Sequence, residues 1–129
     1  MRNTVRNLRY VIDASAVGED SPLVDEADAL FAPELIDLEV ASLLRKSVLR
    51  HERDPAEAGR ILADWATNDL MRFSHAAYLD TVWGLRDNIT TYDAAYVALA
   101  MHLGTPLVTA GRRLAAAAAA YCDVITVGR

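Results

Sequence analysis

A short apolar run at residues 8–12 ends in an acidic residue, Asp13, which is followed by the small residues Ala14, Ser15 and Ala16. This pattern predicts a strand that delivers a carboxylate into the turn after it. Later segments alternate between helical and strand patterns, which is typical of a parallel α/β sheet. Open α/β sheets bind ligands outside the carboxyl ends of their strands, so Asp13 lies where a binding site is expected.

The remaining segments predict the other elements of such a fold. Residues 54–66 have a strong helix start, because Asp54 fits an N-cap and Pro55 follows at the first helical position. Between Asp13 and the helix expected from Pro33 there is room for only a shortened helix, at about residues 23–31. We therefore expect a parallel α/β three-layer sandwich. Its other predicted strands are residues 70–74, 106–110 and 124–127, and its other predicted helices are 33–52, 76–86, 92–103 and 114–121.

Glu39 interrupts the apolar face of the predicted helix 33–52. At about 100° per residue it falls between Leu35 and Leu43, on the side that faces the core. An ionised carboxylate left unpaired there would be strongly unfavourable, so it needs a metal ion, a cationic partner or a raised pKa. An arginine such as Arg86 is the alternative partner.

Asp93 begins a second buried helix face. It precedes Tyr96 and Val97 at the spacing of a single apolar side. Taken alone, Asp93 also fits a capping motif with Thr90, and Asp13 fits an acceptor for backbone N–H groups in a turn. Three acids at strand and helix ends together favour a shared site over separate structural roles.

Four segments place these acids in a fixed order across nearly the whole chain: YVIDASA at 10–16, APELIDLEV at 32–40, TYDAAYVALA at 91–100 and PLVT at 106–109. Together they resemble the PIN-domain ribonucleases, specifically the VapC-type toxins of bacterial toxin–antitoxin pairs. The resemblance implies a PIN-like three-layer α/β/α sandwich with a central, mostly parallel sheet. It also implies a single PIN domain over residues 1–129.

An acidic pocket that holds Mg²⁺ or Mn²⁺ is a further implication, with Asp13 and Asp93 as direct ligands and Glu39 completing the cluster or acting through water. Hard divalent cations take oxygen ligands and keep several waters, so a few carboxylates can hold one beside a substrate phosphate. Such an ion can activate water and neutralise phosphoryl charge during phosphodiester hydrolysis. We therefore expect these three acids to be catalytic. Ser15 is expected either to hydrogen-bond a metal-bound water or to cap the turn.

The activity implied is that of a metal-dependent endoribonuclease, a VapC-type toxin that cleaves structured cellular RNA such as tRNA or rRNA. The implied partners are a cognate VapB-type antitoxin, whose C-terminal segment covers the acidic pocket, and a second copy of the chain in a homodimer. The segment between Asp13 and Glu39 is shorter than in the family, where it borders the antitoxin groove and the dimer surface. Partner binding is therefore expected to be altered.

Gly111 departs from the family pattern. The family has a fourth acid two residues beyond Thr109, and glycine stands there instead. If that acid supports the metal or its surrounding hydrogen bonds, its absence weakens metal binding by about 10- to 100-fold. The alternative function is therefore a catalytically weakened or inactive PIN domain that acts as an antitoxin- or RNA-binding module.

The formal net charge of −5 at pH 7 argues against a generic basic nucleic-acid binder. Basic residues nevertheless gather locally, at Lys46, Arg50 and Arg53 with the spacing of one helix face, and at Arg112 and Arg113. They are expected either to contact RNA phosphates or to be solvated cations near helix ends.

The single Cys122 excludes an intrachain disulfide, and the three histidines lack zinc-ligand spacing. The first seven residues are polar, without an apolar signal core, and no apolar run reaches the roughly 18 residues of a membrane span. We therefore expect a cytoplasmic protein that does not associate with membranes. Trp65 and Trp83 are expected in the core or at a dimer contact rather than as platforms for stacked bases.

Overall fold

The computed structural model describes residues 7–17 and 22–128. Its centre is a five-stranded sheet with the spatial order β3-β2-β1-β4-β5, in which every strand pair is parallel. The strands are β1 (Arg9–Ile12), β2 (Ala29–Pro33), β3 (Met71–Phe73), β4 (Leu107–Thr109) and β5 (Val124–Thr126). The helices are α1 (Pro22–Asp25), α2 (Ile36–Leu49), α3 (Pro55–Ala66), α4 (Leu79–Gly84), α5 (Thr91–Leu103) and α6 (Arg112–Ala118), with 3₁₀ turns η1 (Ala14–Ala16) and η2 (His75–Tyr78).

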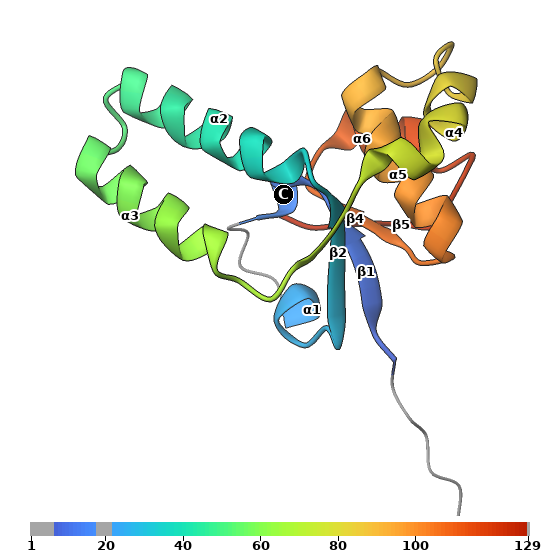
Figure 1. Ribbon diagram of the computed structural model, residues 1–129, viewed down its shortest axis with the longest axis horizontal. Coiled ribbons are helices and arrows are strands. Elements are labelled where there is room, and N and C mark those ends of the chain that lie inside the picture. Colours follow the sequence, from blue (N-terminus) through green and yellow to red (C-terminus); the bar gives the residue numbers. More distant parts are fainter. Residues whose placement is uncertain (1–6, 18–21, 129) are drawn as a thin grey trace, which may run out of the picture.

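Helices cover both faces of the sheet (Figure 1). The elements α1, α2 and α3 lie on one side, and α4, α5 and α6 lie on the other. This arrangement follows from right-handed crossovers, because the chain runs from β1 to β3 in one direction and then continues from β4 to β5 in the opposite one. The expected three-layer α/β/α sandwich is confirmed, and its sheet is fully parallel rather than mostly parallel.

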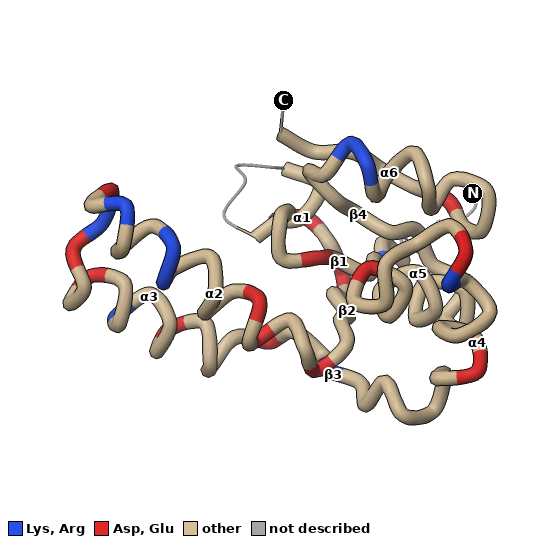
Figure 2. Tube along the Cα trace, turned by 90° about the horizontal axis from the view of Figure 1, so that it is seen from above, with Lys and Arg blue, Asp and Glu red and all other residues tan. Residues whose placement is uncertain are grey.

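The helices α2 and α3 pair with each other and project away from the sheet, as both Figure 1 and Figure 2 show. Asp37 anchors this pair, because its Oδ1 accepts hydrogen bonds from Arg72 Nε of β3 and Trp65 Nε1 of α3, each at 2.8 Å. The Arg72 guanidinium also lies over the Trp65 ring, 5.6 Å from its centroid. Trp65 therefore packs against the core as expected, whereas Trp83 is 68% exposed and does not belong to the core.

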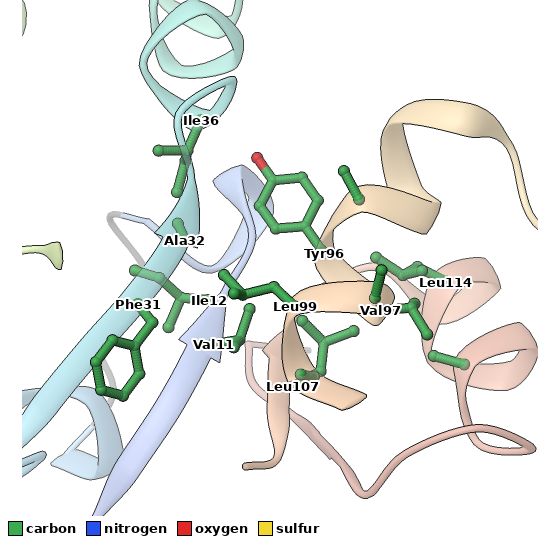
Figure 3. Close-up of a cluster of buried hydrophobic side chains, with 14 of the residues drawn as sticks. Val11, Ile12, Phe31, Ala32, Ile36, Tyr96, Val97, Leu99, Leu107 and Leu114 are labelled. Atoms are coloured by element: carbon green, nitrogen blue, oxygen red, sulfur yellow. The ribbon is translucent and has the colours of Figure 1, made fainter. Parts of the chain in front are cut away.

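The core lies between the sheet and α5, whose residues 94–100 are all buried. Figure 3 shows Val97 and Leu99 of α5 beside Val11 of β1 and Leu107 of β4, and these four side chains have no exposed surface. A helix that is apolar on all sides belongs inside the fold rather than on its surface. This packing fixes the first turn of α5 at the edge of the sheet where the strands end.

The segment before α2 differs from the sequence expectation. We predicted a helix at 23–31 and another from Pro33, but the structure has a single helical turn at α1 and then the strand β2. The apolar run at 29–33 is too short for its periodicity to distinguish a strand from a buried helix. In the structure this segment pairs with β1, where Tyr10 lies opposite Leu30, and with β3 on its other side. This pairing on both sides makes it a strand.

Several boundaries follow local signals closely. Asp54 caps α3, since its Oδ2 accepts hydrogen bonds from the backbone N–H groups of Ala56 and Glu57 at 3.0 and 3.2 Å. Gly104 ends α5 with a left-handed φ of 63°, a conformation that glycine adopts without strain. The helix predicted at 76–86 is instead a 3₁₀ turn followed by the short α4. Of the helices in the described part of the chain, none is long and apolar enough to cross a bilayer.

Candidate functional site

Asp13 follows β1 at the carboxyl edge of the sheet and is 7% exposed. Its Oδ1 accepts hydrogen bonds from the backbone N–H of Ala16 at 3.2 Å and from Ser15 Oγ at 2.7 Å. Its Oδ2 accepts one from Thr109 Oγ1 at 2.7 Å. Three donors facing one carboxyl group fit its ionised form, which can only accept. The turn-capping role that we considered for Asp13 is thus real, and two hydroxyl groups add to it.

The two hydroxyl groups around Asp13 are themselves held by the backbone. Ser15 Oγ accepts a hydrogen bond from Ala110 N at 2.9 Å, and Thr109 Oγ1 accepts one from Gly111 N at 3.0 Å. The two hydroxyl oxygens lie 3.1 Å apart, but each has a single proton, and both protons are directed at Asp13. Asp13 is therefore fixed by groups from the ends of two adjacent strands, β1 and β4.

Glu39 lies in the first turns of α2, is partly buried, and pairs with Tyr96 of α5. Tyr96 is 1% exposed, and its hydroxyl donates a hydrogen bond to Glu39 Oε1. Figure 3 shows the Tyr96 ring reaching from α5 toward Ile36 at the start of α2. The alternative prediction, that Arg86 pairs with Glu39, is wrong. The Arg86 guanidinium lies over the Trp83 ring instead, 4.8 Å from its centroid.

Asp93 is in the first turn of α5 and is partly buried. Thr90 is the N-cap of this helix, but its side chain makes no capping hydrogen bond. The capping motif that we considered for Asp93 is therefore not formed. Asp93 forms no ion pair within the described part of the chain, and it lines a cavity.

These three acids line one cavity of about 260 Å³. They come from three different elements, the turn after β1, α2 and α5, and converge where the parallel strands end. We call this space the acidic cavity. Its other lining residues are Ala14, Ser15, Ser42, Leu43, Lys46 and Tyr96.

Burial raises the pKa of Asp13 above the ordinary carboxylate value of 3.8. Hydrogen bonds from Thr109, Ser15 and the Ala16 amide lower this pKa in part, and the charge of Asp93 raises it further. Burial dominates because an ionised group loses more hydration than the three donors restore. A nearby cation would offset this loss directly.

Glu39 is in the same situation. Burial raises its pKa above the ordinary value of 4.5, the Tyr96 hydrogen bond lowers it, and the charges of Asp93 and Asp13 raise it again. Burial also raises the pKa of the Tyr96 phenol, so the hydroxyl keeps its proton and remains a donor. Two acids with raised pKa values that line one cavity are typical of functional sites.

The oxygen atoms of the acidic cavity fit a hard divalent cation such as Mg²⁺ or Mn²⁺ by their chemistry. Asp13 Oδ2 accepts a single hydrogen bond and keeps a second lone pair, and Glu39 Oε2 accepts none from the described residues. Within residues 7–17 and 22–128, no group of three or more His, Cys, Asp or Glu side chains is arranged as a ready metal cluster.

Gly111 is the N-cap of α6 and lies beside the hydroxyl groups that hold Asp13. Its φ of −83° is available to any residue, so no backbone strain requires glycine here. A Cβ at this position would lie 3.4 Å from Thr109 Oγ1 and 4.0 Å from Ser15 Oγ. A side chain at position 111 would therefore begin beside the hydroxyl groups that hold Asp13, at the place where the resemblance to the family implies a fourth acid.

The basic residues singled out in the sequence do not all lie at the same site. Lys46 lines the acidic cavity, and Arg113 lines an adjoining cavity. The expectation that Lys46, Arg50 and Arg53 share one helix face is wrong, because α2 ends before Arg53, which pairs with Glu57 at 3.1 Å. Figure 2 shows basic stretches in the distal part of the α2–α3 pair and at the start of α6.

Sequence reasoning did not assign Tyr96 and Thr109 to this site. Tyr96 was placed on an apolar helix face, although its position three residues after Asp93 puts it on the same side as that acid. The hydroxyl of Tyr96 on an otherwise apolar helix face is the sequence signal that points to the site. Thr109 is fully buried at the end of β4, and its contact with Asp13 depends on the order of the strands.

Residues 10–120 match the family model described as the PIN domain. A VapC ribonuclease of Mycobacterium bovis is 36% identical over 126 residues, which cover 92% of this chain and 98% of that protein. Ribonuclease VapC1 of Mycobacterium tuberculosis is 42% identical over 94 residues, covering 72% of this chain and 71% of that protein. The crystal structure of PAE2754 from Pyrobaculum aerophilum is similar with a TM-score of 0.67 at 26% identity, over 92% of this chain and 89% of that one.

Proposed function

The chain belongs to the PIN-domain family, among the VapC ribonucleases, and on this premise we propose that it is a divalent-metal-dependent endoribonuclease that cleaves structured cellular RNA such as tRNA or rRNA. The observation that carries the proposal is the acidic cavity, where Asp13, Glu39 and Asp93 meet at the carboxyl edge of a parallel sheet. That edge is where α/β folds bind their ligands. Three acids repel an RNA phosphate, and a bound cation would offset that repulsion at the reacting phosphate.

Asp13 and Asp93 would hold Mg²⁺ or Mn²⁺ directly, and Glu39 would act through a water. When bound, the cation would lower the pKa of a water for attack on phosphorus and neutralise charge on the phosphoryl oxygens. Ser15 and Thr109 donate hydrogen bonds to both oxygens of Asp13, which orients the carboxylate and favours its ionised form. Tyr96 engages Glu39 Oε1, which leaves Oε2 as the acceptor for a proton from the attacking water.

The proposal includes the partners of a toxin. A cognate VapB-type antitoxin would neutralise the nuclease in the cytoplasm, with its C-terminal segment over the acidic cavity, and the active form would be a homodimer. The VapC names of the relatives support this part of the proposal. The single helical turn of α1, in the segment between Asp13 and β2, would alter the antitoxin groove and the dimer surface relative to other family members.

A second function has its own supporting observation. Gly111 stands where the family has a fourth acid, and a Cβ there would lie 4.0 Å from the hydroxyl oxygen of Ser15, which lines the acidic cavity. A site that lacks one carboxylate binds its metal more weakly. The alternative is therefore a weakened or inactive PIN domain that binds an antitoxin or RNA.

Cleavage of total tRNA and rRNA by the purified chain, freed of any antitoxin, tests the proposal. With Mg²⁺ or Mn²⁺ we expect discrete cleavage products, and with EDTA none. Asp13→Asn should reduce the cleavage rate by at least about 100-fold, since it removes a direct ligand. Asp87→Asn is the matched control, because Asp87 is exposed and lines neither the acidic cavity nor the cavity beside it.

The possible results separate the two functions. Cleavage that disappears with EDTA and with Asp13→Asn, but not with Asp87→Asn, supports a working nuclease. If the chain is inactive and Gly111→Asp produces metal-dependent cleavage, the alternative holds and the present chain is a binding module. Cleavage that survives both EDTA and Asp13→Asn would contradict a metal-dependent mechanism at this site.

A further inference from the structure

Asp93 lines both the acidic cavity and a second cavity of about 210 Å³. The second cavity lies between the start of α5 and the first turns of α6. We call it the α6 cavity. Its lining residues are Asn88, Ile89, Thr90, Asp93, Arg113, Leu114 and Ala117.

Lys46 is the basic residue of the acidic cavity. Glu39, Ser42 and Lys46 are separated by three and four residues, which places them along one side of α2, and all three line the cavity. Lys46 is exposed, and it forms no ion pair within the part of the chain that the structure describes. Its neighbour Arg45 is equally exposed but lines neither cavity.

Arg113 is the basic residue of the α6 cavity, where it shares the lining with Thr90 and Asn88. It lies in the first turn of α6, where a positive charge is unfavourable because the amino end of a helix is itself positive. No described acid forms an ion pair with it. Neither an ion pair nor the helix dipole therefore accounts for a positive charge at Arg113. Its neighbour Arg112 lines neither cavity.

We propose that Lys46 and Arg113 bind the phosphates on the two sides of the scissile bond, so that an RNA strand crosses both cavities with its reacting phosphate near Asp93. This inference rests on the proposed nuclease function and adds the residues that hold the RNA backbone. In a chain with a net charge of −5, the acids repel RNA. One cation on each side of Asp93 offsets that repulsion where the strand enters and leaves.

Binding of a fluorescently labelled single-stranded RNA, measured by anisotropy in EDTA so that no cleavage occurs, tests this inference. The salt dependence of the affinity counts phosphate contacts, because each contact on a single strand contributes about 0.7 to the slope of log Kd against log salt concentration. We expect Lys46→Gln and Arg113→Gln each to lower that slope by about 0.7, and the double variant by about 1.4. All four residues compared are exposed, so each variant is expected to fold, which circular dichroism verifies.

The matched controls are Arg45→Gln and Arg112→Gln, which remove the same charge one residue away. They should leave the slope within about 0.2 of the wild-type value, since neither side chain lines a cavity. Equal slopes for all four single variants would overturn the proposal, because the chain would then respond only to its net charge. Absence of RNA binding by the wild-type chain would overturn it as well.

The nuclease function is measured separately, as cleavage by the wild-type chain with Mg²⁺. If Lys46→Gln and Arg113→Gln alone reduce the slope while the wild type does not cleave, the phosphate contacts hold and the nuclease function fails. If the wild type cleaves but the four variants bind alike, the nuclease function holds and the phosphate contacts fail.

Discussion

Asp13 and Glu39 are buried acids that are stabilised in different ways. Asp13 has donors at both oxygens, two hydroxyl groups and a backbone amide, all from the ends of β1 and β4. Glu39 has a single donor, the Tyr96 hydroxyl, which comes from a helix on the other face of the sheet. Glu39 is therefore the acid whose position depends most on one side chain.

Tyr96→Phe should destabilise the protein and weaken the site. The substitution removes the hydrogen bond to a carboxylate that is only partly buried, so we expect a loss of about 1–2 kcal/mol in the free energy of unfolding, measured with urea. RNA cleavage should fall as well, because Glu39 is no longer oriented. Tyr92→Phe is the control, since Tyr92 is 69% exposed and should change the stability by less than about 0.5 kcal/mol. Equal losses for the two variants would contradict a specific role for Tyr96.

The raised pKa values of Asp13 and Glu39 determine the direction in which the stability of the metal-free protein changes with pH. Since both carboxyl groups titrate at higher pH when folded, the folded state binds more protons than the unfolded state above about pH 4, near their ordinary values of 3.8 and 4.5. Their contribution to stability is therefore present below that pH and is lost as the pH rises through the folded pKa values.

We expect the free energy of unfolding of the wild-type chain, relative to the double variant Asp13→Asn/Glu39→Gln, to decrease as the pH rises from 4 to 8. Urea unfolding in EDTA at a series of pH values measures this difference, and the other acids cancel because both proteins contain them. A difference that stays constant or increases with pH would show that hydrogen bonding outweighs burial at these two acids.

At the scale of elements, the α2–α3 pair has the least apolar support. Only Ile36 and Val40 of α2 and Ala58 of α3 are buried, whereas α5 has buried residues from 94 to 100. Leu44, Leu62 and Trp65 pack against the core, and the contact of Asp37 with Arg72 of β3 adds a polar attachment of this pair to the sheet. Because α2 also carries Glu39 and Lys46, the position of this pair sets the shape of the acidic cavity.

Asp37→Ala should weaken the attachment of the α2–α3 pair to β3. It leaves the donors of Arg72 and Trp65, both partly buried, without their acceptor, and we expect a loss of about 1–2 kcal/mol in urea unfolding. Glu57→Ala is the comparison, because the Arg53–Glu57 pair is 36% and 50% exposed and should contribute less than about 0.5 kcal/mol. If both substitutions cost the same small amount, apolar contacts alone hold the pair.

At the scale of the whole molecule, burial of Asp13 and Glu39 opposes their ionisation, and the cation of the proposed function would offset that cost. Mg²⁺ should therefore raise the stability of the entire domain, by about 1.4 kcal/mol when its concentration is ten times the Kd. Thermal unfolding with and without Mg²⁺ measures the gain. Asp93→Asn should abolish most of it, and Asp87→Asn, which changes the net charge equally, should retain it. Loss of the gain in both variants would indicate general charge screening instead of a specific site.

Much of the fold could be predicted because its signals are local. Asp54 and Pro55 mark the start of α3, and Gly104 marks the end of α5, through hydrogen bonds and dihedral preferences within a few residues. The strand β2 could not be assigned in this way. Its five residues have no clear periodicity, and the neighbouring strands on both sides are what make it a strand.

The same division holds for the candidate site. The sequence by itself determined that Asp13, Glu39 and Asp93 occur at the ends or first turns of regular elements, because that placement follows from local pattern. Only the tertiary structure decided that they share a cavity, that Tyr96 rather than Arg86 is the partner of Glu39, and that Arg113 rather than Arg112 faces the adjoining cavity. Those relations join residues far apart in the chain, and their geometry depends on strand order and helix packing, which no short stretch of sequence specifies.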